Sequence, residues 1–395
     1  MKYSILNLAL SFLMLFAVNG LSAQNKDTET DKTSYGFNSK IEIPVTPVKD
    51  QHRSGTCWSF AATSFLEAEL LRVTGDEYDL SEMFFVRYSY ENKAIDYVRR
   101  HGKANFSPGG QAHDAFDVIR EYGMVTEKGY PGLTKGEEKH NHSELDAVLS
   151  GFVSAVVQNK GRRLSEVWFD GFRALLDVYM GPVPEDKSKE FVEVRKFNPD
   201  DYVELTSYNC YEWYEKVNLQ IPDNWSYSSY VNVPLDEMME VINYAFENGF
   251  SVCWDGDVSS RGFSHRNGVA IVPEEKVDNM AGTEQSRWEA IPASERADKL
   301  YAFEGPVPEQ QIDDDARMEV FANYTSTDDH LMHLTGVVED HAGNIYYKTK
   351  NSWDTDSNEM GGYLNMSEAY VRLNTVAIMV HKDAVPKHLQ KKFGL

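Results

Sequence analysis

One cysteine, Cys57, lies where a loop leads into an apolar helix, six residues after Gln51. Residues 51–61 read QHRSGTCWSFA, and the apolar residues that follow recur at helical spacing. A thiol attacks as its thiolate, and a helix N-terminus lowers a thiol pKa through its unpaired N–H groups and positive dipole end. The Gln51 amide is a neutral donor that could stabilise an oxyanion. These neighbours favour a catalytic nucleophile over a buried structural cysteine at position 57.

A second group of reactive residues lies near the C-terminus. Residues 328–339 have the pattern of a strand, 340–343 that of a turn, and 344–353 that of an antiparallel partner strand. This hairpin brings Asn351 beside the start of the first strand, which carries His330 and His333. A histidine is the base that a cysteine nucleophile needs, and an asparagine can fix its tautomer and orientation.

The two histidines compete for the role of base. They are three residues apart, so without a bulge they face opposite sides of the sheet and only one can meet Cys57. The hairpin pattern alone does not fix the register to one residue, and it leaves the choice between His330 and His333 open.

Several helices and one buried strand are expected to position these groups. Ser81 is a plausible N-cap for a helix that follows it. Residues 107–111, SPGGQ, form a turn or a loop of close backbone approach. Residues 275–320 are polar and charged, which indicates a surface excursion. Helical periodicity marks residues 57–73, 112–122, 143–158, 164–178 and 235–248, and residues 250–254 read as a strand.

Composition limits the class of protein. The chain has 395 residues, 42% of them hydrophobic and 12% aromatic, enough for one large domain or two modest ones. Its formal net charge of −23 at pH 7 repels nucleic acid and anionic membrane surfaces. After the N-terminus, no run approaches eighteen consecutive apolar residues. We therefore expect no nucleic-acid partner and no membrane span.

The N-terminus has the pattern of an export signal. Lys2 precedes an apolar stretch over residues 5–18 and small residues up to Ala23, which predicts a signal peptide over 1–23 and a mature start at Gln24. The protein is then expected to be periplasmic or secreted. Residues 24–40 are polar and predict a disordered linker.

Cysteine usage fits a free thiol. Only Cys57, Cys210 and Cys253 are present, too few for a disulfide framework in an oxidising compartment. Spacing does not decide whether Cys210 and Cys253 pair.

These motifs resemble the papain-like cysteine peptidases. The resemblance rests on Gln51, on the helix start CWSF at 57–60, and on NSW at 351–353 after a strand that bears histidine. Within that group the chain looks most like the branch of bleomycin hydrolase and aminopeptidase C, and the resemblance covers most of residues 41–386. The motifs that carry it are LSEMFF at 80–85, PGGQ at 108–111, GDV at 256–258, HLM at 330–332 and LTGV at 334–337.

The resemblance implies a role for each matched residue. Cys57 would be the nucleophile, His330 the general base and acid, and Asn351 the residue that orients His330. Gln51 and the Cys57 N–H would form the oxyanion hole. His333 would then be a structural histidine. The implied substrate-binding positions are Gly109, Gly110 and Trp353, of which Trp353 would also shield the contact between His330 and Asn351.

The implied function is hydrolysis of peptide bonds through a thioester, with an imidazolium at His330 beside a Cys57 thiolate, and with no metal or organic cofactor. An aminopeptidase acting on unfolded peptides is favoured. An endopeptidase with an open cleft and a non-catalytic peptide-binding homologue are the alternatives. The implied fold is α+β in two lobes, one helical and one an antiparallel, barrel-like sheet. The domain would span residues 41–395, with a helical insertion over about 130–250.

The C-terminus departs from the branch that the chain resembles. There, an extended tail lies in the cleft with its carboxylate on the substrate's amino group, and six subunits form a closed barrel. In this chain the tail, residues 387–395, is shorter and more basic than the resemblance implies. Both tail gating and a homo-hexamer are left open.

Overall fold

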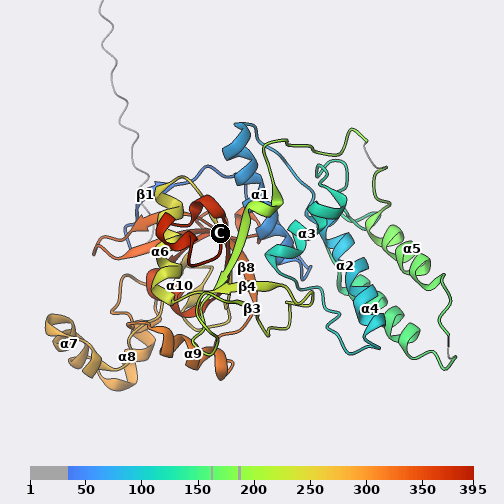
Figure 1. Ribbon diagram of the computed structural model, residues 1–395. Helices are drawn as coiled ribbons and strands as arrows, with labels where there is room; N and C mark the ends of the chain where they lie inside the picture. Colours follow the sequence, from blue (N-terminus) through green and yellow to red (C-terminus); the bar gives the residue numbers. More distant parts are fainter. Residues whose placement is uncertain (1–33, 162, 186–187) are drawn as a thin grey trace, which may run out of the picture.

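A computed structural model describes residues 34–161, 163–185 and 188–395, so the predicted signal peptide lies outside the described residues. Helices gather on one side of the molecule, and a large sheet with its covering helices lies on the other (Figure 1). Each side has its own hydrophobic core. The predicted two-lobe α+β fold is confirmed.

The helical lobe is built around one helix that is buried along most of its length. Its residues Trp58 to Leu70 are all buried, which explains why its apolar residues are not confined to one face. Ser81 caps the next helix by accepting a hydrogen bond from the Phe84 N–H. The helices of this lobe are α1 (Cys57–Thr74), α2 (Glu82–Arg99), α3 (Ala112–Tyr122), α4 (Ser143–Val157) and α5 (Trp168–Met180).

The second lobe contains one open, mixed sheet. Over the described residues β3 and β6 are its two edges, so the barrel-like closure expected from the resemblance is wrong. One further strand, β1 (Asn38–Glu42), pairs with β8. In spatial order the other strands are β3 (Lys216–Asn218), β4 (Ser229–Asn232), β2 (Tyr202–Thr206), β11 (Thr375–His381), β5 (Val252–Gly256), β8 (His330–Glu339), β9 (Ile345–Lys350), β10 (Tyr363–Ser367), β7 (Val269–Ala270) and β6 (Phe263–Ser264).

Helices and single turns complete this lobe. Helix α6 packs its apolar face on the sheet, and α7 and α8 form a projection with a small core of their own (Figure 1). The helices are α6 (Leu235–Glu247), α7 (Gly282–Glu289), α8 (Ala293–Leu300), α9 (Asp314–Ala322), α10 (Glu368–Asn374) and α11 (Lys387–Gln390), and the turns are η1 (Pro199–Asp201), η2 (Val277–Asn279), η3 (Thr355–Ser357) and η4 (Lys382–Ala384).

The central strands β5 and β8 hold the two lobes together through their alternating side chains. Cys253 and Leu331 belong to the core of the helical lobe, while Trp254 and Met332 belong to the core under α6. This is the period of two expected of a strand that is buried on both faces. Strand β8 therefore runs beneath α1, and its first residue lies near the start of that helix.

Two predicted segments differ from the structure. Tyr35, inside the predicted linker 24–40, is buried against Tyr346, and residues 38–40 already belong to β1. The aromatic residues Tyr35 and Phe37 bind this segment to the sheet. The predicted helical insertion over 130–250 is also corrected, because residues 202–232 contribute β2, β3 and β4 to the sheet.

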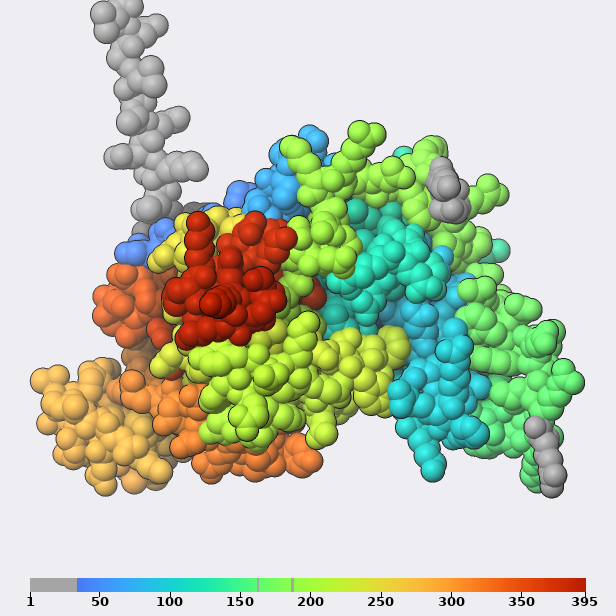
Figure 2. Space-filling view, viewed as in Figure 1, coloured from blue at the N-terminus to red at the C-terminus, as the bar shows by residue number. Residues whose placement is uncertain are grey.

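The C-terminal tail, residues 387–395, packs on the outside of the sheet lobe. Leu389 and Phe393 are buried in the core beneath α6, and Lys392 Nζ forms an ion pair with Glu237 of that helix at 2.7 Å. Figure 2 shows the C-terminal segment, in red, on the outer surface of this lobe. Helix α1 lies on the opposite face of the sheet, so the tail does not enter the site described below.

Two other predictions concern features of the whole chain. None of the three cysteines is paired, so Cys210 and Cys253 form no disulfide. Cys253 is buried in the core, and Cys210 is exposed. Among the described residues, no helix has the length and apolar character that a membrane crossing requires.

Candidate active site

Cys57 is the first residue of α1 and lies beside the start of β8. The preceding Thr56 provides no side-chain cap, so the helix N-terminus is directed at the site without a competing hydroxyl. The Leu331 backbone hydrogen-bonds the thiol. This contact places the sulfur next to the residue that follows His330, and the side chain keeps partial exposure to solvent.

His330 is held by the residues that the hairpin brings back to it. Its Nε2 donates to Asn351 Oδ1 at 2.8 Å, and the same oxygen accepts from the Ser352 N–H at 2.8 Å. The Trp353 ring lies 4.9 Å from the His330 ring, between centroids. With Nε2 occupied, Nδ1 is the ring nitrogen left to face the thiol.

Gln51 is fixed by the same segment. Its Oε1 accepts from Ser352 Oγ at 2.6 Å, and its Nε2 donates to the Ser54 carbonyl at 3.0 Å. The backbones of the two segments also pair, through the Gln51 N–H and the Ser352 carbonyl. An amide nitrogen has two hydrogens, so one remains for a substrate oxygen.

The second histidine of β8 points elsewhere. His333 Nδ1 lies 2.9 Å from Ser64 Oγ in the middle of α1, and its ring packs edge-on against Phe65. It is completely buried, and burial holds its pKa well below the usual range. The prediction that the two histidines face opposite sides agrees with this arrangement.

The surroundings of the pair act on both pKa values. Burial and the charges of Asp223, Asp255 and Asp328 raise the pKa of the Cys57 thiol to about 12, against the effect of the Leu331 hydrogen bond. Burial also lowers the pKa of His330 to about 4. Both shifts favour a neutral thiol beside a neutral imidazole. The thiolate with an imidazolium that the resemblance implies stays a prediction.

Gly110 packs against Trp58, the residue that follows Cys57. A Cβ on Gly110 would stand 3.0 Å from the Trp58 ring and 2.7 Å from Asp114 Oδ2, so only glycine fits. The Trp58 indole donates to the Pro108 carbonyl at 3.0 Å. Lys93 Nζ donates to the Ser107 carbonyl at 2.9 Å and to the Gly109 carbonyl. The glycine loop is thereby attached to α1 and α2.

Three residues of the site were not identified from the sequence. Ser352 orients Gln51, and Asp223 lies against Gly109. The His265 ring lies 4.8 Å from the Trp353 ring, between centroids, and its Nδ1 lies 3.4 Å from Asn351 Nδ2. Ser352 could have been found, since it adjoins Asn351. His265 and Asp223 come from distant loops and have no local pattern.

This α+β fold places a cysteine at a helix N-terminus and, on the facing sheet, a histidine that an asparagine fixes. These features together define a papain-like cysteine peptidase. The model of the papain family cysteine proteases matches residues 34–167. The model of the Peptidase C1-like family matches residues 183–394, more than half of the chain. The chain belongs to the Peptidase C1-like family. The resemblance to the bleomycin hydrolase and aminopeptidase C branch is confirmed.

Some relatives match most of the chain, and others match only a part of it. Aminopeptidase G of Lactobacillus delbrueckii subsp. lactis is 22% identical over 398 residues, covering 89% of this chain and 84% of the relative. A cathepsin L-like peptidase of Aedes aegypti is 41% identical over 111 residues, only 30% of its own length. The crystal structure of PepW from Lactobacillus rhamnosis shares the fold, with a TM-score of 0.66, 17% identity and coverage of 90% and 84% of the two chains.

Proposed function

We propose that this protein is a cysteine aminopeptidase in which Cys57 is the nucleophile and His330 its base. The observation that carries the proposal is the bond from His330 Nε2 to Asn351 Oδ1, formed one residue away from the backbone contact of the Cys57 thiol. It fixes the ring and leaves Nδ1 for the thiol proton.

The reaction begins from the neutral pair. As the Cys57 sulfur attacks the peptide carbonyl carbon, its proton passes to His330 Nδ1, and the developing imidazolium is stabilised by the Asn351 oxygen. The oxyanion is held by the Cys57 N–H and the remaining Gln51 amide hydrogen, a kind of contact whose loss costs about 10²–10³ in rate.

The second half of the cycle regenerates the thiol. The proton on His330 passes to the departing amine as the carbon–nitrogen bond breaks, leaving a thioester on Cys57. A water molecule gives a proton to His330 and attacks the thioester, and the sulfur leaves and recovers its proton. Trp353 covers the His330–Asn351 bond on one side, which limits competition by water.

Two observations favour an exopeptidase over an endopeptidase. The full-length relative described above is named an aminopeptidase. In addition, the Asp223 carboxylate packs against Gly109, one of the two glycines that the resemblance implies bind the substrate.

The test compares a peptide with a free N-terminus and its N-acetylated form. The wild-type protein is expected to hydrolyse the free peptide from its N-terminus, releasing single amino acids that mass spectrometry detects. Equal or faster cleavage of the acetylated peptide would favour the endopeptidase, and no cleavage of either would favour a non-catalytic homologue.

Export remains part of the proposal and rests on the N-terminal sequence alone. A charged residue, an apolar stretch and small residues before Gln24 are the features that signal peptidases recognise. Intact-mass analysis of the protein isolated from its own cells should give a chain that begins at Gln24. A chain that retains Met1 would refute export by this signal.

A further inference from the structure

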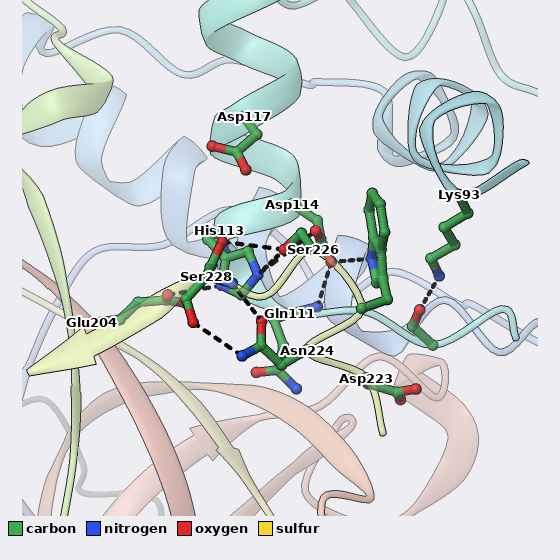
Figure 3. Close-up of polar contacts among 12 residues, drawn as sticks. Lys93, Gln111, His113, Asp114, Asp117, Glu204, Asp223, Asn224, Ser226 and Ser228 are labelled. Atoms are coloured by element: carbon green, nitrogen blue, oxygen red, sulfur yellow. Dashed lines mark hydrogen bonds and ion pairs between the residues drawn. The ribbon is translucent and has the colours of Figure 1, made fainter. Parts of the chain in front are cut away.

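A loop of the sheet lobe reaches across to the helical lobe at the glycine pair. This loop, residues 219–228, joins β3 to β4, and we call it the strap. Trp225 Nε1 donates to Asp114 Oδ2 at 2.9 Å, and Ser226 Oγ lies 2.9 Å from His113 Nε2, so both contacts hold the strap to α3. The Asn105 amide donates to the Pro222 carbonyl at 2.6 Å. Figure 3 shows Ser226 beside His113 and Asp114 at the start of α3.

The strap places a carboxylate on the substrate-binding glycine. A Cβ built on Gly109 would lie 1.9 Å from Asp223 Oδ2, so this oxygen packs directly against the glycine. The other oxygen, Oδ1, accepts from Ser107 Oγ at 3.2 Å. We therefore expect a peptide that runs along the glycine pair to end at Asp223.

Two more carboxylates lie behind Asp223. Asp328 Oδ2 accepts from the Asp223 N–H at 3.1 Å, and its Oδ1 accepts from Gln111 Nε2 at 2.9 Å. Asp255 is 3% exposed, and neither of its oxygens has a hydrogen-bond partner among the described residues. The charges of Asp223 and Asp328 act on Asp255, and all three act on Cys57.

Within the part of the chain that the structure describes, none of these three carboxylates forms an ion pair. Lys93 is near enough to influence Asp223, but its ammonium group is occupied by the Ser107 and Gly109 carbonyls. A buried carboxylate without a partner is costly, and a bound ammonium group would offset that cost. A peptide that ends beside Gly109 has such a group at its N-terminus.

We propose that Asp223, with Asp328 and the unpartnered Asp255 behind it, binds the free α-ammonium group of the substrate. This inference rests on the proposed function and deepens it, because it assigns the selection of N-termini to the strap. The C-terminal tail, which lies on the other face of the sheet, takes no part in that selection.

The experiment uses the full-length enzyme and three forms of one peptide: with a free α-amino group, with that group replaced by hydrogen, and N-acetylated. The Asp223→Asn variant keeps the shape of the side chain and removes its charge. The matched control is Asp117→Asn, which removes an exposed carboxylate on α3, one turn after Asp114. Thermal unfolding checks that each variant folds, and Asp328→Asn is the second variant should Asp223→Asn not fold.

The wild-type enzyme should prefer the free amine to the deaminated peptide in kcat/KM. Asp223→Asn should lower kcat/KM for the free amine about tenfold to a hundredfold, the range for a hydrogen bond between charged groups, with most of the loss in KM. The deaminated peptide should show no loss, because it has no ammonium group for Asp223 to bind and the variant removes a charge that raises the pKa of Cys57. Asp117→Asn should behave as wild type. Equal losses on the free and deaminated peptides, or an unchanged preference, would overturn the inference.

A further arm separates the α-ammonium group from a basic side chain. An Nα-acetyl-lysyl peptide cleaved as fast as the free-amine peptide would show that the carboxylates bind a side chain, which also overturns the proposal. Failure of the proposed function has a different signature, since wild type would then cleave none of the peptides or would prefer acetylated ones. A wild-type preference for free amines that survives in Asp223→Asn and Asp328→Asn contradicts the role of the strap alone.

Discussion

At the scale of single residues, the site combines reactive groups with an electrostatic penalty. Burial and three aspartates raise the pKa of the Cys57 thiol and burial lowers that of His330, which favours proton transfer to His330 during attack rather than before it. An ammonium group bound at Asp223 would reduce the negative potential at the sulfur. Substrate binding would thereby make the thiol easier to ionise.

The buried carboxylates should also reduce the stability of the free enzyme. Burial raises the pKa of Asp255 well above its usual range and that of Asp328 to about 7, and Asp223 raises both further. Above about pH 4 the unfolded chain ionises freely while the folded chain resists ionisation. Stability is therefore lost as the pH rises from about 4 through about 7.

Asp255→Asn should accordingly raise the Tm near pH 8 and have little effect near pH 4. We expect a gain of about 2–4 °C, which is the shift that ~1 kcal/mol produces in domains of about 150–250 residues. The measurement is thermal unfolding of wild type, Asp255→Asn and Asp117→Asn across this pH range. The groups that act on Asp255 are Asp328, Asp223, Gln111 and Glu204. A variant that is less stable at pH 8 would show that Asp255 has a structural partner.

At the scale of elements, local periodicity predicted some helices and strands and not others. The helix at residues 57–73 and the hairpin at 328–353 were confirmed as α1 and as β8 with β9, because their patterns are continuous and their ends carry turn residues. The hairpin then explains why Asn351 meets His330. A strand was expected where β2 lies, but β3 and β4 were missed, because they have only three and four residues and too short a pattern to read.

The strap illustrates the same limit within the site. Its sequence, LQIPDNWSYS, mixes polar and apolar residues without a recognisable motif. The strap gains importance from contacts to residues 105–114, more than a hundred positions earlier, and to Asp328. Such contacts depend on how the two lobes pack together. No pattern within one segment could have revealed them.

The tail is an element whose role the structure changes from gating to packing. Deleting residues 387–395 removes the buried side chains of Leu389 and Phe393 and should destabilise the protein by several kcal/mol, since a single such side chain contributes about 2–5 kcal/mol. The preference for free amines should persist in the truncated protein. Thermal unfolding and the free and acetylated peptides measure both effects, and a lost preference with an unchanged Tm would restore tail gating.

At the scale of the whole molecule, the two lobes divide the chemistry between them. The helical lobe supplies Cys57, Gln51 and the glycine pair, while the sheet lobe supplies His330, Asn351 and the strap. The sequence motifs predicted which residues carry out the reaction. They could not predict the burial of the pair or the carboxylates around it, because burial follows from the packing of both lobes.

The kinetics of three single variants test the central claim most directly. With the free-amine peptide, Cys57→Ala should have no measurable turnover, and His330→Ala should lose at least about 10² in kcat, the lower range for general acid–base catalysis. His333→Ala should retain most of the wild-type kcat and lose stability instead, because it removes a buried ring that contacts Ser64 and Phe65. Residual turnover by Cys57→Ala, or a greater loss of kcat in His333→Ala than in His330→Ala, would contradict the account.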